Sequence, residues 1–111
     1  SVGALAMNLL QFAKQGMSTV HGSLQNCPDG RFFGSQTLKN VIWQARNQAI
    51  HCEEGNPNNA VRNCFSTLTA DFGPDFDITS NPTDSKAKKV IDQLGWNSFH
   101  QYESDMQSLL G

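Results

Sequence analysis

The sequence predicts one small all-α domain, a bundle of four to five helices over residues 1–111. Apolar residues recur every three to four positions along most of the chain, as they do on the buried face of a helix. Turn-forming Gly, Pro and Asn residues separate these segments, and no segment alternates apolar and polar residues as a strand does. A chain of 111 residues is also long enough to bury one core. We therefore expect a bundle without a β-strand pair, and only the loop 75–84 has room to hide one.

The first helix is expected from Val2 to about Leu24, before the turn 26–30. This segment contains two groups of apolar residues. We take the group that recurs at helical spacing as the main buried stripe and the other group as its adjoining flank. The predicted main stripe is Leu5, Leu9, Phe12, Gly16 and Val20, with Leu10, Ala13 and Met17 on the flank.

The second helix is expected from about Thr37 to Glu54, with Ser35 or Thr37 as its N-cap and Gly55 at its end. One clean apolar stripe follows this helix and predicts its buried face. The stripe consists of Leu38, Val41, Ile42, Ala45, Ala49 and Cys52.

Three further segments complete the predicted bundle. The turn 56–59 caps a third helix, which ends at Gly73-Pro74, and a loop covers 75–84. A short fourth helix covers about 85–94, and Asn97 caps the last helix. The predicted buried faces are Val61, Cys64, Phe65, Leu68 and Phe72 on the third helix and Phe99, Tyr102, Met106, Leu109 and Leu110 on the last.

Composition limits the environment and the partners. No apolar run approaches the roughly 20 residues needed to cross a bilayer, so no membrane contact is expected. Three cysteines without CxxC spacing indicate neither a disulfide framework nor a zinc site, which favours a reducing cytoplasm. A net charge of -2 argues against holding long nucleic acid, DNA included, so RNA contact would be local. Because the sequence starts without Met and opens directly in a helical pattern, we expect a piece of a longer chain.

The second predicted helix carries a second face opposite its core stripe. Asn47 lies on that face, with Trp43 and Ile50 on one flank and His51 on the other, while Arg46 lies at the boundary. Exposed Trp and Ile beside polar groups are typical of a surface that meets a partner, here a second copy of the chain. The alternative is that the fourth or fifth helix covers Trp43 and Ile50.

The run Arg46-Asn47-Gln48-Ala49-Ile50-His51 resembles the motif of HEPN domains: an Arg, four to six residues, then a His, often with Asn directly after the Arg. The resemblance covers this motif and the small helical architecture. It implies a metal-independent endoribonuclease of the kind found in toxin–antitoxin and phage-defence systems. It further implies a homodimer in which Arg46 and His51 of both copies form one site, with no cofactor or metal, and an antitoxin or a larger protein as partner.

The residue types suit that chemistry. Without a metal, the ribose 2′-OH attacks the adjacent phosphorus and yields a 2′,3′-cyclic phosphate and a 5′-OH. Histidine transfers protons near neutral pH, and arginine places a fixed positive charge on phosphate oxygens. Asn47, one turn before His51, is placed to orient the imidazole or the phosphate. The alternative is a non-catalytic interaction or nucleotide-binding module with the same fold, since a fold does not determine a function.

One position departs from a related toxin subgroup, which carries a Tyr two residues after the motif His that a partner antitoxin nucleotidylates. Glu53 stands there instead, so that mode of control is not expected. Glu53 and Glu54 also place negative charge beside the proposed site. This charge would disfavour RNA binding unless the two side chains point away from the site or bind Arg.

The remaining candidates are weaker. His21 and His100 stand alone and are expected to be surface or satisfied side chains. The aspartates Asp71, Asp75 and Asp77 lack calcium-loop spacing and predict a polar loop. Lys86, Lys88 and Lys89 predict a solvated face, with contact to an RNA backbone as the alternative.

Overall fold

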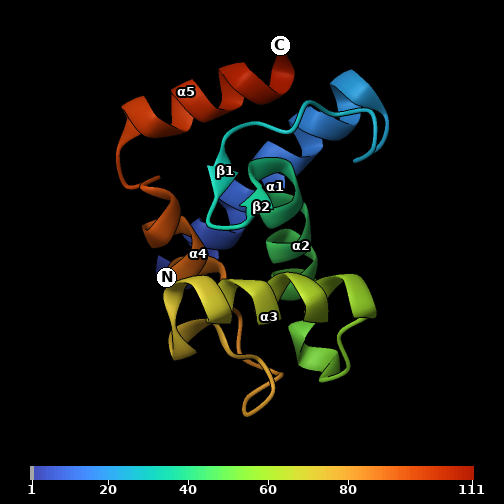
Figure 1. The fold of residues 1–111 in the computed structure, drawn as a ribbon, viewed down its shortest axis with the longest axis vertical. Helices are drawn as coiled ribbons and strands as arrows, with labels where there is room; N and C mark the ends of the chain where they lie inside the picture. The colour runs from blue at the N-terminus through green and yellow to red at the C-terminus, as the bar shows by residue number, and fades with distance from the viewer. Residues whose placement is uncertain (1) are drawn as a thin grey trace.

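The computed structural model describes residues 2–111 and confirms a small helical bundle, to which it adds one short hairpin (Figure 1). The α-helices are α1 (Val2–His21), α2 (Leu38–His51), α3 (Asn59–Phe72), α4 (Ala87–Leu94) and α5 (Phe99–Leu110). The other elements are strands β1 (Phe32–Phe33) and β2 (Gln36–Thr37) and the 3-10 turns η1 (Cys52–Glu54) and η2 (Pro74–Phe76).

Helix α2 is the central element and packs against α1, α3 and α4. Its predicted cap is confirmed: the Thr37 side chain accepts a hydrogen bond from the Asn40 amide at 3.4 Å. The predicted stop at Gly55 is confirmed by its left-handed φ of 68°, but the α-helix itself ends at His51, three residues before the predicted Glu54, and η1 fills the gap. The predicted stripe is buried from Leu38 to Ala49, so α2 contributes one full face to the core.

The expectation that the chain holds no strand pair is wrong. Phe32 pairs with Thr37 and Phe33 with Gln36, between the predicted turn 26–30 and the second helix, around a turn in which Gly34 has a φ of 62°. Each strand has only two residues, too few for an alternating pattern to appear in the sequence. Asp71 of α3 holds this turn by accepting hydrogen bonds from the Ser35 amide and hydroxyl, both at 2.8 Å.

The predicted face of α1 also needs correction. The presumed flank is the buried face, whereas Leu5 and Phe12 are each 66% exposed and Val20 is 54% exposed. Apolar residues cover so wide an arc of this helix that spacing alone does not reveal which part the neighbouring helices cover. The helix ends at His21, before Leu24, because Gly22 turns the chain with a φ of 84°.

The later helices lie close to their predicted bounds. On α3 the predicted face is buried except for Phe72, which is half-buried against Phe33 with ring centroids 4.8 Å apart. The cap of α5 is Ser98 rather than Asn97, since its side chain accepts from the Gln101 amide at 3.5 Å. Phe99 does not share the buried face, because it stands at the start of the helix and is 73% exposed.

A buried carboxylate joins the hairpin to the C-terminal helices. Asp105 of α5 is 3% exposed and accepts from the Arg31 guanidinium at 2.9 and 3.0 Å and from the Trp96 indole at 2.8 Å. Arg31 also donates to the Leu94 carbonyl at 2.7 Å, at the end of α4. One carboxylate thereby fixes the segment before β1, the link between α4 and α5, and α5 itself.

Replacing this carboxylate should destabilise the fold strongly. We expect Asp105→Ala to lower the free energy of unfolding by about 3–5 kcal/mol, because it leaves a guanidinium and an indole N–H without their buried partner. Glu103→Ala, at an exposed position of the same helix, should change it by less than about 0.5 kcal/mol. Urea denaturation followed by tryptophan fluorescence measures both, and equal stability of the two variants would contradict this role.

Candidate functional site

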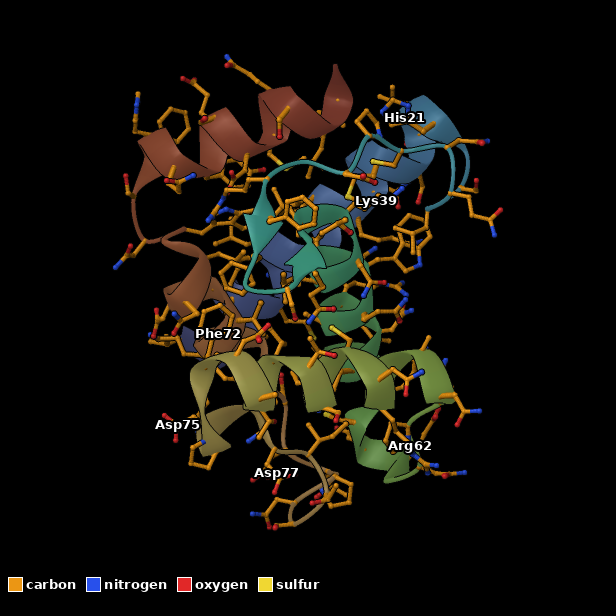
Figure 2. All side chains as sticks on the ribbon, viewed as in Figure 1. His21, Lys39, Arg62, Phe72, Asp75 and Asp77 are labelled. Carbon is orange, nitrogen blue, oxygen red and sulfur yellow. The ribbon has the colours of Figure 1, made fainter. Side chains whose placement is uncertain are left out.

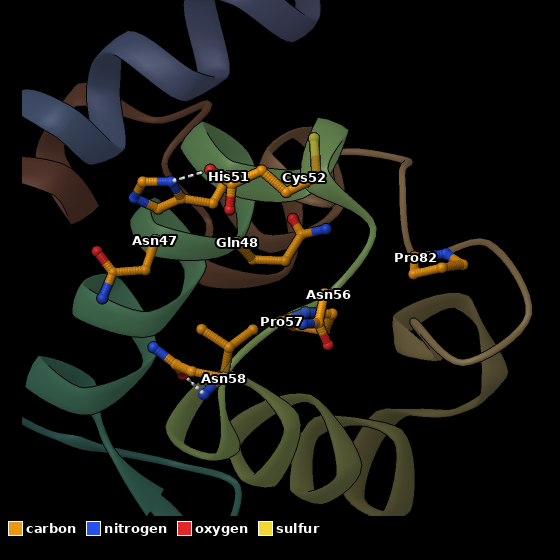
Figure 3. Close-up of a pocket in the computed structure, with 10 residues that line it drawn as sticks. Asn47, Gln48, His51, Cys52, Asn56, Pro57, Asn58 and Pro82 are labelled. Atoms are coloured by element: carbon orange, nitrogen blue, oxygen red, sulfur yellow. Dashed lines mark hydrogen bonds and ion pairs between the residues drawn. The ribbon is translucent and has the colours of Figure 1, made fainter.

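A surface cavity of about 320 Å³ lies at the C-terminal end of α2 (Figure 3). Asn47 and His51, one helical turn apart, contribute one wall, and the chain between α2 and α3 contributes another through Asn56, Pro57 and Asn58. Pro82 closes the cavity from the loop before α4. Two of the three motif residues therefore line one cavity, because their four-residue spacing places them on the same side of α2.

Arg46 does not line this cavity. Its Nε donates to Oε1 of Gln11 on α1 at 2.6 Å, and its Nη1 donates to Oδ1 of Asn47 at 2.9 Å. The guanidinium is half-buried and has no acidic partner among residues 2–111. Arg46 is thus linked to the cavity through Asn47, and three of its five N–H groups have no protein acceptor in that part of the chain.

His51 ends α2 and is exposed, and its Nδ1 lies 3.3 Å from Oε1 of Glu54. When the neutral imidazole carries its proton on Nδ1, this N–H donates a hydrogen bond to Glu54, and Nε2 keeps a free lone pair. Glu54 therefore neither points away nor binds Arg, the two arrangements that would favour RNA. Since His51 and Glu54 are the ionisable imidazole and carboxylate in the lining, the cavity is amide-rich rather than basic.

Gln48 lies within the motif, and the sequence offered no role for it. Its side chain is 3% exposed; Nε2 donates to the Asp84 carbonyl at 2.7 Å, and Oε1 accepts from the Lys86 amide at 2.8 Å. One amide thus holds the segment before α4 against α2 and completes the cavity wall. The signal in the sequence is that Gln48 lies three residues after Ala45 and four before Cys52, at the spacing of the core stripe, where a buried amide needs hydrogen-bond partners.

The outward strip of α2 is partly covered. Trp43 is half-buried, and the Lys14 ammonium of α1 lies 4.9 Å from its ring centroid. Ile50 is 39% exposed. The covering neighbour of Trp43 is therefore α1, where the alternative had named the fourth or fifth helix, and Ile50 stays at the surface.

The other candidate groups do not form a site. His21 bonds the Leu109 carbonyl at 2.7 Å, and His100 is exposed. Lys86 is buried, so it does not belong to a solvated face with Lys88 and Lys89. No group of three or more His, Cys, Asp or Glu residues within 2–111 is arranged to hold a metal ion.

Two cysteines near α2 and α3 stay protonated. Burial, followed by the charge of Glu53, raises the pKa of the Cys52 thiol above its usual value. Burial raises the pKa of Cys64 to about 12. Because the thiolate is the nucleophilic form, neither side chain is suited to covalent chemistry at neutral pH.

Comparison with family models, with curated proteins and with solved structures finds no match for this chain. Within residues 2–111, the helices are all too short or too polar to cross a membrane.

Loss of the Gln48 clamp should loosen the cavity wall. We expect Gln48→Ala to lower the free energy of unfolding by about 2–4 kcal/mol, because the Asp84 carbonyl and the Lys86 amide both lose their partner. Hydrogen exchange of the Lys86 amide should accelerate as well. Gln93→Ala, at an exposed position on α4, is the matched control and should leave both unchanged. An unchanged Lys86 exchange rate in Gln48→Ala would refute the clamp.

Proposed function

We propose that this chain is a metal-independent RNA endonuclease of the HEPN kind, with a site built from Arg46, Asn47 and His51. A role in a toxin–antitoxin or phage-defence system belongs to the same proposal. One observation carries it: Asn47 and His51 line one cavity, and Arg46 bonds directly to Asn47.

The arrangement supplies the groups that 2′-OH attack requires. Nε2 of His51 accepts the 2′-OH proton while O2′ forms its bond to phosphorus, and the bond from phosphorus to O5′ breaks. Arg46 offers N–H groups and a fixed charge to the phosphate oxygens, and Asn47 holds its guanidinium. The leaving O5′ needs a proton, and we assign that step to a protonated His51 of a second copy. Glu54 orients the imidazole and acts as a positioning residue.

The second copy is proposed to pack with α2 near a two-fold axis. Ile50 is exposed beside the cavity, and Trp43 and Asn47 lie on the same outward strip, so a symmetric contact would bring two motifs together. The exposed stripe of α1, with Phe12 at its centre, is the competing surface for such a contact.

A second candidate function has support of its own. The cavity is lined by amide side chains that both donate and accept hydrogen bonds, and Arg46 faces Gln11 rather than the cavity. These features favour a non-catalytic nucleotide-binding or interaction module, in which the motif residues bind without cleaving.

The cleavage mechanism predicts large rate losses in variants that still fold. His51→Ala should lower the cleavage rate by about 10²–10⁴-fold through loss of the proton-transfer group, and Arg46→Ala by about 10²–10³-fold. Cleavage should persist in EDTA, and RNA with a 2′-deoxy ribose at the scissile position should resist. Single-turnover gel assays on labelled RNA measure these rates.

His100→Ala is the matched control, since His100 is an exposed histidine on α5, and it should cleave at the wild-type rate. Cleavage that requires Mg²⁺, or that persists unchanged in His51→Ala, would exclude the mechanism. Absence of cleavage in the wild-type protein together with saturable nucleotide binding would favour the binding module.

The dimer makes a separate prediction. Ile50→Asp should raise the dimer Kd by roughly a hundredfold or more, because both copies lose a buried apolar side chain at one interface. Phe12→Asp should leave it unchanged. Multi-angle light scattering across a concentration series measures both values. A wild-type monomer at high micromolar concentration, or dissociation by Phe12→Asp alone, would contradict a dimer through α2.

A further inference from the structure

A second surface cavity, of about 670 Å³, adjoins the one that contains His51. Pro57 and Pro82 line both cavities, so two proline rings separate them. The second cavity lies between α3 and the loop 77–82, and in Figure 2 its residues Arg62 and Asp77 lie below α3. A polymer bound at His51 could therefore continue past the prolines into this space.

The lining of the second cavity combines apolar surface with hydrogen-bonding groups. Pro57 and Pro82, both half-buried, supply the accessible apolar surface, and the buried Phe65 and Ile78 lie behind it. Ser66 and Thr69 follow Arg62 at helical spacing on one face of α3. Ser66 supplies a hydroxyl group, and the Thr69 hydroxyl, which donates to the Phe65 carbonyl at 2.7 Å, supplies an acceptor. Apolar surface with a few placed polar groups is the usual make-up of a pocket for a small organic ligand, a class that includes a nucleobase.

Asp77 supplies the acceptor on the opposite wall. Its Oδ1 accepts from the Thr79 amide at 2.8 Å and from the Thr79 hydroxyl at 2.7 Å. These bonds, the hydroxyl one first, hold the pKa of Asp77 below its usual value, so the group is a carboxylate at neutral pH. Its remaining lone pairs suit the N–H edge of a nucleobase rather than a phosphate.

Arg62 supplies positive charge at the border between the two cavities. It lines the second cavity, while its Nη2 donates at 3.0 Å to Oδ1 of Asn56, which lines the first. The guanidinium is exposed and has no carboxylate partner among residues 2–111. An exposed arginine without an acidic partner is suited to bind a phosphate.

We propose that this second cavity is a nucleotide subsite: one base of a single-stranded RNA binds between α3 and the loop 77–82, and Arg62 binds the phosphate attached to it. The inference rests on the proposed function, because it states where the nucleotide next to the scissile bond is held. Recognition of single-stranded RNA through a splayed-out base is a common mode.

Nucleotide titration of the His51→Ala protein tests the subsite without relying on cleavage. Each of the four ribonucleoside 3′-monophosphates is added while backbone amides are followed by NMR. Saturable shifts are expected at Ser66, Thr69 and Thr79. Arg62→Ala, made in the same background, should weaken the affinity by roughly 10- to 100-fold, the cost of losing a charged hydrogen bond to phosphate. Lys88→Ala, an exposed cation on α4, is the control and should change it less than about twofold.

Three results would overturn the subsite: shifts confined to Asn47, Gln48 and Cys52 around the first cavity, no saturable shift at about 10 mM nucleotide, or equal affinity in the Arg62→Ala protein. The two proposals fail separately. Saturable binding here without RNA cleavage by the wild-type protein would refute the nuclease and retain the subsite. Cleavage without these shifts would refute the subsite alone.

Discussion

The two hydrogen bonds of Gln48 are the constraint on which the site depends. Helix α2 must bury one face against three other helices and still leave Asn47 and His51 accessible at its end. Gln48 meets both requirements. Its side chain is buried, and its amide fixes the backbone at Asp84 and Lys86. That contact keeps the preceding loop, with Pro82, beside the cavity. Residues 77–86, between η2 and α4, are otherwise rich in turn formers and form no helix or strand that could position them.

Local signals explain which parts of the fold the sequence could predict. The local signals are two N-caps, Thr37 and Asn58, and one helix stop, Gly55. Each acts within one turn of its own position, so its neighbours in the chain suffice to identify it. The buried face of α1 is different, because Phe12 and Met17 are equally apolar and only the packing of other helices decides between them. The hairpin at Phe33 depends on contacts from α3 that lie far away in sequence.

The same distinction applies to the site. Asn47 and His51 share a side because they lie four residues apart on a helix, which is a local property. The partner of Arg46 is Gln11, on another helix and 35 residues earlier, and no pattern within the motif points to it. Pro82 and Arg62 join the site region only through the fold, from the loop before α4 and from α3. The sequence therefore places the candidate residues Asn47 and His51 together, and tertiary packing determines the cavities around them.

We propose above that His51 and Arg46 direct attack by the ribose 2′-OH on the adjacent phosphate, and the chemistry of the product ends tests this mechanism most directly. Purified wild-type protein is incubated with a defined RNA in EDTA, and the fragments are analysed by mass spectrometry. We expect fragments with 2′,3′-cyclic phosphate and 5′-OH ends, and we expect none of them in the His51→Ala reaction. Fragments with 3′-OH and 5′-phosphate ends would contradict it, because they require water rather than the 2′-OH as the nucleophile.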